Sequence, residues 1–413
     1  MGTKFRTDHL ARKALALTES LIAAHGPRVA GSEADLKTAE DLHAELSAVC
    51  DSAHIESFSM RPGSFLGFLR VTPVFFITAA VLLLLGHVVA AAAFFTLSSA
   101  IAFSQFICYR QVFDPFYPER EGRNVYGVIE PSGEPRGQIV ISGHHDSAYE
   151  FTLMTRLRGA YRPCVAGIIV SLVAAPLLTW AWVLWRAFTG AAPVFATAHT
   201  YGVFAAFIFI VPMFFFTGKN GTPGAGDNLV ASAMAVELAK FFGASKKAGR
   251  SPVRHTRLIF LSIDAEEAGL RGARAFAGRH ADELRSLPTR VLNMDSIYRK
   301  DRIKFLISDI NGFVKLSRDM AEECVAVAEK AGYGAKLFRV YPGVGGTDAA
   351  EFAKIGIEAT TLIAVPTDVE KEPMVYHTPD DTVDNIEPGV VEACLRIVHD
   401  YILKKDAEAG VGK

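Results

Sequence analysis

The residues of this sequence that could carry chemistry are histidines and carboxylates placed where predicted strands end. Five of them make up a mixed nitrogen and oxygen set: His144, Asp227, Glu267, Asp295 and His377. Such a donor set suits borderline metal ions, zinc above all. The sequence therefore predicts a zinc site at one edge of a sheet.

The first motif, GHHDS, follows an apolar run and contains His144 and Asp146. Residues two apart on an extended chain point the same way, and a metal-binding imidazole usually donates its other N–H to a carboxylate. We therefore expect Asp146 to orient His144. The alternative interpretation is a polar strand end without a metal.

Two further motifs also have two interpretations. Asp227 follows a glycine-rich loop and opens a predicted helix, so its carboxylate could be an N-cap as well as a ligand. Glu266 and Glu267 follow an apolar strand, and adjacent carboxylates repel each other unless a cation lies between them or one is protonated. One glutamate could bind a metal while its neighbour handles the proton of a water. The alternative is an acidic helix start, which the helix dipole favours.

Composition narrows the class of protein. Hydrophobic residues make up 50% of the 413 residues and charged residues 21%, as in a soluble domain combined with a more apolar part. The 43 Lys and Arg nearly balance the 44 Asp and Glu, so we expect no nucleic-acid partner. The five cysteines are widely spaced and form no Cys-x-x-Cys pair, which argues against a disulfide framework.

Two long apolar regions stand apart from the rest of the sequence. No Asp, Glu, Lys or Arg occurs between Arg70 and Arg110, and a second region from Pro163 to Phe216 is interrupted only by Arg186. Each region can supply two helices of about 18 to 20 residues, the length that crosses a hydrocarbon core. We therefore predict four transmembrane helices in two hairpins, residues 65–110 and 160–218, with a lipid bilayer as partner. The alternative is buried helices of a large soluble domain.

Each hairpin returns the chain to the side that it left, so the remaining segments should share one compartment. Basic residues flank the hairpins on this shared side: Arg61, Arg70, Arg110, Arg156, Arg158, Arg162 and Lys219. Arg186 lies on the opposite side, and the positive-inside rule then places the shared side in the cytoplasm. The sequence predicts a multi-pass protein of the plasma or inner membrane with a cytoplasmic catalytic domain.

Outside the hairpins, residues 1–64, 111–155 and 220–413 alternate predicted strands with helices. This alternation predicts a three-layer α/β/α domain with a mixed, mostly parallel sheet. Strands are expected at residues 124–129, 138–142, 256–263, 290–294, 303–307, 335–340 and 357–364, and helices at residues 228–242, 312–331 and 388–404. Ligands of such sheets gather beyond the carboxyl ends of strands, where the motifs fall.

The motifs occur in an order that resembles the co-catalytic di-zinc aminopeptidase family, clan MH, which also contains glutamate carboxypeptidases and glutaminyl cyclases. They are His-x-Asp, Gly-x-x-Asp-Asn, Ala-Glu-Glu-x-Gly-Leu-x-Gly, Asn-Met-Asp and Tyr-His-Thr. The segment GGTDAAEF, with Asp348 and Phe352, also resembles a family segment near the active site. The resemblance covers most of the chain outside the hairpins and implies a zinc-exopeptidase-like fold.

Carried over by position, the resemblance implies two zinc ions on five ligands: His144 and Asp295 for one ion, Glu267 and His377 for the other, and Asp227 bridging both. It implies that Glu266 is the general base, which takes a proton from the water that the metals activate and delivers it to the leaving amine. The implied function is a membrane-bound metallo-exopeptidase acting on peptides, in the first place an aminopeptidase.

The sequence departs from the family pattern at Gly226, where many relatives have an Asp, and at Arg271, where an apolar residue is common. Two other functions stay open: a glutaminyl-cyclase-like acyltransferase, which the ligand set alone does not exclude, and a non-catalytic membrane receptor or scaffold. A transporter is disfavoured because the predicted spans contain no Asp, Glu or Lys. Substrate side chain and oligomeric state are not predicted.

Overall fold

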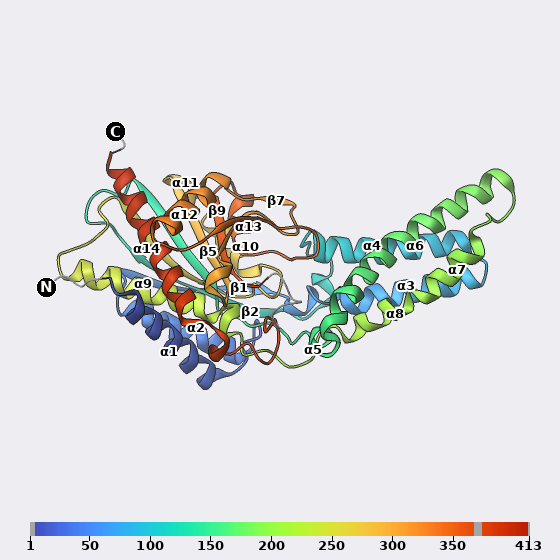
Figure 1. Ribbon diagram of the computed structural model, residues 1–413, viewed down its shortest axis with the longest axis horizontal. Helices are drawn as coiled ribbons and strands as arrows, with labels where there is room; N and C mark the ends of the chain where they lie inside the picture. Colours follow the sequence, from blue (N-terminus) through green and yellow to red (C-terminus); the bar gives the residue numbers. More distant parts are fainter. Residues whose placement is uncertain (1–4, 367–373, 412–413) are drawn as a thin grey trace. The chain divides into compact units, whose positions relative to one another are not determined.

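The computed structural model describes residues 5–366 and 374–411 and divides the chain into two compact units. The first, here called the α/β unit, comprises Met1–Pro62, Glu119–Tyr149 and Asn220–Lys413. The second, here called the helical unit, comprises Gly63–Pro118 and Glu150–Lys219. Figure 1 shows that the first unit holds the sheet and that the second is built of helices.

The sheet of the α/β unit is mixed. Its described strands are β1 (Ser52–Met60), β2 (Arg120–Ile129), β3 (Gly137–His144), β4 (Thr256–Ile263), β5 (Thr289–Ile297), β6 (Lys304–Asp309), β7 (Val314–Lys315), β8 (Lys336–Arg339) and β9 (Glu358–Ala364). Their order is β1-β2-β4-β3-β5-β9-β6-β7, and β8 pairs with β6. The central strands β4, β3, β5 and β9 are parallel, whereas β1, β2, β6 and β7 join by antiparallel ladders. The prediction of a mixed sheet is confirmed, but the sheet is not mostly parallel: among the described strands four pairs are parallel, including β6 with β8, and four are antiparallel.

Helices cover both faces of the sheet, which confirms the predicted α/β architecture. They are α1 (Thr7–His25), α2 (Glu33–Ser47), α9 (Val230–Lys247), α10 (Arg271–Arg279), α11 (Ala281–Ser286), α12 (Arg318–Lys330), α13 (Ala349–Lys354) and α14 (Pro388–Val411). On β3, Ile139 and Ile141 pack into the core shared with α1, α2, α9, α12 and α14, while Val140 packs toward α10, α11 and α13. This alternation follows from the period of two in a strand.

One local prediction was wrong, and one strand was not predicted. Residues 312–331 were expected to form one helix, but α12 begins at Arg318 and β7 precedes it. Ile310, Asn311 and Gly312 all have positive φ, so the chain reverses here and pairs β7 with β6 before the helix starts. Strand β1 was not predicted, because this edge strand is mostly polar and only Met60 in it is buried.

The helical unit contains α3 (Phe68–Leu84), α4 (Val88–Ala102), α5 (Thr152–Leu157), α6 (Tyr161–Thr189), α7 (Ala196–Ala205) and α8 (Phe207–Ile210). Helices α3 and α4 pack through small residues such as Ala80 and Ala91, and the Ser98 hydroxyl donates to the Thr72 carbonyl at 2.9 Å. Such close helix contacts are common between apolar helices.

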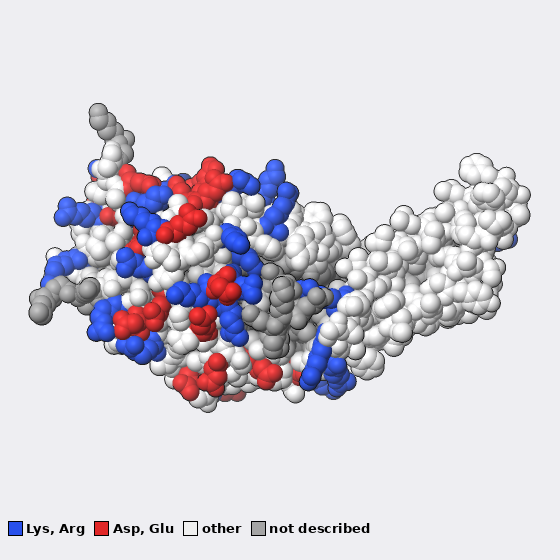
Figure 2. Space-filling view, viewed as in Figure 1, with Lys and Arg blue, Asp and Glu red and all other residues white. Residues whose placement is uncertain are grey.

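Four helical stretches of this unit are long and apolar enough to cross a membrane, judged by length and composition alone: Pro62–Leu84, Val88–Ile107, Thr152–Thr189 and Ala196–Phe215. Large apolar side chains are exposed on them, among them Leu177 (65% exposed) and Ile208 (71% exposed). In Figure 2, the visible face of these helices is almost free of Lys, Arg, Asp and Glu, which gather on the α/β unit.

Candidate metal centre

The predicted site residues lie at the carboxyl ends of neighbouring parallel strands. His144 is the last residue of β3, Asp295 lies near the end of β5, and Glu266 follows β4 after a short loop. Asp227 lies in the turn of Ala225–Leu229 that precedes α9, and His377 lies in the loop before α14. Adjacent parallel strands end at one edge of a sheet, which is why segments far apart in sequence meet here.

Three of the predicted ligands form a compact, largely buried cluster. One donor atom each of His144, Asp227 and Glu267 lies within 4.8 Å of the others. His144 Nε2 lies 3.5 Å from Asp227 Oδ1, and the side chain of His144 is 1% exposed. His144 Nε2 is buried and donates to or accepts from no described group within hydrogen-bond distance. A buried imidazole nitrogen without a partner is costly unless something else binds it.

His377 completes the cluster from the opposite side. Its Nε2 lies 2.9 Å from Asp227 Oδ2 and 2.9 Å from Glu267 Oε1. The ring of Tyr376 stacks on the His377 ring with 3.7 Å between centroids. The two carboxylate oxygens of Asp227 therefore face two different histidines, as a bridging carboxylate between two ions would require.

Asp295 reaches the same cluster through a β-bulge. The register between β5 and β9 shifts between Asp295 and Ile297, and Ser296 at the bulge has a φ of +52°. The Ser296 hydroxyl donates to Asp295 Oδ1 at 2.9 Å and lies 3.4 Å from Asp227 Oδ1. Bulges of this kind re-aim side chains next to functional sites.

Asp146 connects His144 to the glutamate pair. Its carboxylate accepts the backbone N–H groups of Glu266 and Glu267, each at 3.1 Å. His144 Nδ1 lies 3.1 Å from the Asp146 carbonyl oxygen and 3.3 Å from Oδ1. Asp146 therefore fixes the loop that carries Glu266 as well as the ring of His144, and the motif alone did not indicate this second contact.

Glu266 projects into the cluster without being part of the compact group of three. Its Oε2 lies 3.9 Å from His144 Nε2, and its side chain is 11% exposed. Three non-glycine residues in or next to the site have positive φ: Ala265 and Ser296, which precede Glu266 and follow Asp295, and His377 itself. Such conformations are uncommon and cluster at functional sites, where the surrounding structure holds them.

Burial and mutual contacts shift the pKa values of the carboxylates and histidines in this cluster. Burial raises the pKa of Glu266 well above its usual value, and burial raises the pKa of Asp295 to about 8. Burial alone would also raise the pKa of Asp227, but its contacts with His144 and His377 outweigh this and hold that pKa low. Burial lowers the pKa of His377, yet Glu267 and Asp227 raise it to about 10.

These residues fit zinc. Carboxylates outnumber imidazoles in the cluster, so the two rings alone cannot neutralise it even when both are protonated. The donors are imidazole nitrogens and carboxylate oxygens, and His144 has the hydrogen-bonded outer contact that metal-binding histidines commonly have. His144, Asp227, Glu267, Asp295 and His377 could therefore hold one or two divalent ions.

Several residues of the site were missed by sequence reasoning. Asp381 accepts the backbone N–H of Gly226 at 2.8 Å and of Asp227 at 3.2 Å. Arg28 is fully buried and donates to the carbonyls of His145 and Gly224, which ties the loop after β3 to the loop before Asp227. Both contacts span more than a hundred residues of sequence, so no local pattern could reveal them.

The two departures from the family pattern have structural explanations. A Cβ on Gly226 would lie 2.2 Å from Cε1 of Tyr298, so the glycine makes room for this buried ring. Arg271 is buried at the start of α10, and its Nε donates to the Ala268 carbonyl at 3.0 Å. Neither residue supplies a ligand to the cluster.

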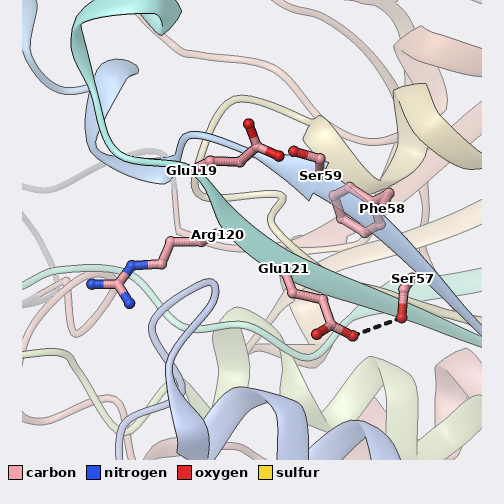
Figure 3. Close-up of a pocket in the computed structure, with 6 residues that line it drawn as sticks. All are labelled: Ser57, Phe58, Ser59, Glu119, Arg120 and Glu121. Carbon is pink, nitrogen blue, oxygen red and sulfur yellow. Dashed lines mark hydrogen bonds between the residues drawn. The ribbon is translucent and has the colours of Figure 1, made fainter.

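A surface hollow of the α/β unit lies away from these residues. It is lined by β1 and the start of β2: Ser57, Phe58, Ser59, Glu119, Arg120 and Glu121 (Figure 3). Within this hollow the Ser57 hydroxyl donates to Glu121 Oε1 at 2.7 Å. A smaller hollow is lined by Tyr298 and Tyr376 and therefore adjoins the cluster at His377.

Solved structures with this fold include enzymes of two kinds. The glutaminyl cyclase of an Acidobacteriales bacterium aligns with a TM-score of 0.56 at 16% identity, covering 96% of this chain and 95% of that chain. The zinc aminopeptidase BSAP from Bacillus subtilis aligns with a TM-score of 0.55 at 14% identity and covers the same fractions. These similarities establish the zinc-exopeptidase-like fold.

Sequence comparison identifies the family. A probable glutamate carboxypeptidase of Arthroderma benhamiae is 40% identical over 72 residues, which are 17% of this chain and 10% of that protein's length. The profile of "Peptidase family M28" matches residues 192–402, just over half of the chain, and this range includes Asp227, the glutamate pair, Asp295 and His377. The chain therefore belongs to peptidase family M28.

Proposed function

We propose that this protein is a membrane-bound zinc exopeptidase of the aminopeptidase type, with Glu266 as its general base. The observation that carries the proposal is the buried cluster in which Asp227 presents one carboxylate oxygen to His144 and the other to His377. Membership of a peptidase family and the fold shared with a zinc aminopeptidase support it.

Each site residue would have a distinct role in hydrolysis. His144 and Asp295 would hold one zinc ion, Glu267 and His377 the other, and Asp227 would bridge them. When bound, the ions would supply Lewis-acid polarisation of the scissile carbonyl and of a water. Glu266 would take the proton of that water and return it to the leaving amine, and its position next to the cluster, partly open to solvent, supports this role. Asp146 would keep both His144 and Glu266 in position.

Membrane attachment is the second part of the proposal. The four apolar stretches of the helical unit would span the bilayer, and their exposed leucines and isoleucines would face lipid. The basic residues flanking the hairpins favour a cytoplasmic α/β unit. Alkaline extraction tests membrane spanning, and a protein released by alkali would contradict it. Protease treatment of membrane vesicles tests the cytoplasmic location: we expect the α/β unit to be protected in right-side-out vesicles and digested in inverted vesicles.

The activity is tested on the full chain purified in detergent. Zinc content is measured, and three substrate classes are compared: dipeptides with a free amine, N-blocked dipeptides, and peptides that begin with glutamine. We expect at least the two co-catalytic zinc ions, release of the first residue only from free amines, and loss of activity on chelation that zinc restores. Ammonia release with cyclisation of glutamine peptides would point instead to the cyclase function, and bound zinc without any turnover would point to a receptor or scaffold.

A further inference from the structure

A second group of potential metal ligands lies immediately behind the first. Asp35, His145 and Asp264 are each fully buried, and one donor atom of each lies within 4.8 Å of the others. Asp35 lies in the first turn of α2, while the other two residues directly follow β3 and β4. None of the three has a role in the proposed hydrolysis.

His144 and His145 serve different clusters because successive residues of an extended chain point to opposite sides. His144 faces Asp227 and the glutamate pair. The Nδ1 atom of His145 instead lies 2.9 Å from the Ser262 hydroxyl, and its Nε2 atom lies 3.6 Å from Asp35 Oδ1. The pair of histidines in GHHDS thus supplies one imidazole to each side of the strand.

Each of the three side chains uses one polar atom to anchor itself and leaves the other without a partner. Asp35 Oδ2 accepts the Gly31 N–H at 2.9 Å, and Asp264 Oδ2 accepts the Arg123 N–H at 2.6 Å. The remaining atoms, Asp35 Oδ1, Asp264 Oδ1 and His145 Nε2, are buried and have no hydrogen-bond partner among the described residues. Three partnerless polar atoms that converge in a closed interior would be strongly destabilising without a further group between them.

We propose that Asp35, His145 and Asp264 bind a third divalent ion, a structural zinc ion separate from the co-catalytic pair. Two ligand atoms of a tetrahedral zinc ion are about 3.3 Å apart, close to the 3.6 Å between His145 Nε2 and Asp35 Oδ1 and longer than a hydrogen bond. One imidazole and two carboxylates would leave a neutral complex, and the contacts from Ser262, Gly31 and Arg123 hold the ligands as outer partners do at known sites.

Within residues 5–366 and 374–411, no neighbouring cation already fills this role. The guanidinium of Arg28 is close in space, but its described hydrogen bonds go to four backbone carbonyls, those of Gly26, His145, Pro223 and Gly224. The remaining alternative is a proton shared between Asp35 and Asp264, which would satisfy two of the three atoms and leave His145 Nε2 without a partner.

The ion would tie together segments that also carry the co-catalytic residues. His145 is next to His144 in the chain, and Asp264 is two residues before Glu266. A structural ion at this place would therefore set the spacing of the ends of β3 and β4 before the co-catalytic ions bind.

The test separates this ion from the proposed pair. His144→Ala combined with His377→Ala removes both imidazole ligands of the co-catalytic cluster, and zinc is measured per folded chain after gel filtration in metal-free buffer. We expect one ion to remain, with an X-ray absorption spectrum of one imidazole and otherwise oxygen ligands. Adding Asp35→Asn to this background should bring the zinc content close to zero, whereas Asp309→Asn, a matched change of a buried aspartate outside the cluster, should leave one ion.

Two results would overturn the proposal: no zinc in the double variant, as a shared proton would give, or a remaining ion that Asp35→Asn leaves in place. If Asp35→Asn does not fold, His145→Gln replaces it, and the absorption spectrum of the double variant decides by itself. Failure of the hydrolase proposal would be seen separately, as absence of turnover in the wild-type chain.

Discussion

The two units of this protein treat charge in opposite ways. The α/β unit buries carboxylates and histidines beyond the ends of its central strands and in the adjoining loops. Backbone N–H groups hold two of these carboxylates, those of Asp146 and Asp381. The helical unit has four apolar stretches and exposes side chains such as Leu177 and Ile208. The proposed chemistry belongs to the α/β unit, where burial strengthens electrostatic interactions. The helical unit instead exposes the apolar surface that the proposed membrane attachment would cover.

The same charge placed at one exposed apolar position in each unit tests whether the two units have different surroundings. Leu177→Lys puts an ammonium in the middle of α6, where membrane insertion should lose about 3 kcal/mol if the helix faces lipid. Val411→Lys changes an 84% exposed residue at the end of α14 in the α/β unit. The measurement is the fraction of protein that stays in membranes after alkaline extraction.

We expect Leu177→Lys to lower that fraction strongly and Val411→Lys to leave it unchanged. Equal behaviour of the two variants would mean that the surroundings of α6 are as aqueous as those of α14, and the membrane part of the proposal would fail.

We expect the next largest change, in the free energy of unfolding, from overpacking next to the proposed metal ligands. Gly226→Ala would bring a Cβ to 2.2 Å from the Tyr298 ring, so the turn before α9 or the ring must move. We expect a loss of about 1 to 3 kcal/mol in unfolding free energy, as for other overpacked sites, seen as a lower Tm. Gly278→Ala is the control, because this helical glycine has nothing within 4 Å of the added Cβ. Equal Tm values for the two variants would show that the site tolerates the extra methyl group.

The smallest expected effect is a change in the pH dependence of stability, caused by a buried carboxylate that is not a proposed metal ligand. Burial raises the pKa of Asp309 to about 6, although hydrogen bonds from Thr347 and Ile310 oppose the shift. A raised pKa means that the folded chain holds the proton more tightly than the unfolded chain, so this residue lowers stability as pH rises from about 4 to about 6.

In Asp309→Asn this contribution is absent, so the Tm of the variant relative to wild type should rise over that pH interval. The fully exposed Asp282, changed to Asn, serves as the control. A constant difference between Asp309→Asn and wild type from pH 4 to pH 7 would contradict the expected titration.

Much of the architecture could be predicted from local sequence. Apolar runs located all the central strands, and residues 256–263 and 357–364 were placed within one residue of β4 and β9. Edge strand β1 and the reversal before α12 were missed, because an edge strand carries few buried residues and three consecutive positive φ values leave no periodic pattern.

The site was predictable only as a set of residue types at strand ends. The distances that bring Asp227 between His144 and His377 depend on strand order, which the sequence does not state. His145 had no assigned role for the same reason: its partners Asp35 and Ser262 come from segments more than a hundred residues away. The two clusters are distinguished by polar contacts between distant segments, which local secondary-structure propensity does not reveal.

The most direct test of the central claim is Glu266→Gln in the full chain. The change keeps the shape of the side chain and all five proposed ligands but removes the group that would accept the proton. Glu121→Gln, at an exposed glutamate of the surface hollow, is the matched control. We predict that Glu266→Gln retains its zinc and loses hydrolysis by about a hundred- to ten-thousand-fold, while Glu121→Gln stays active. Undiminished hydrolysis by zinc-loaded Glu266→Gln would contradict the account.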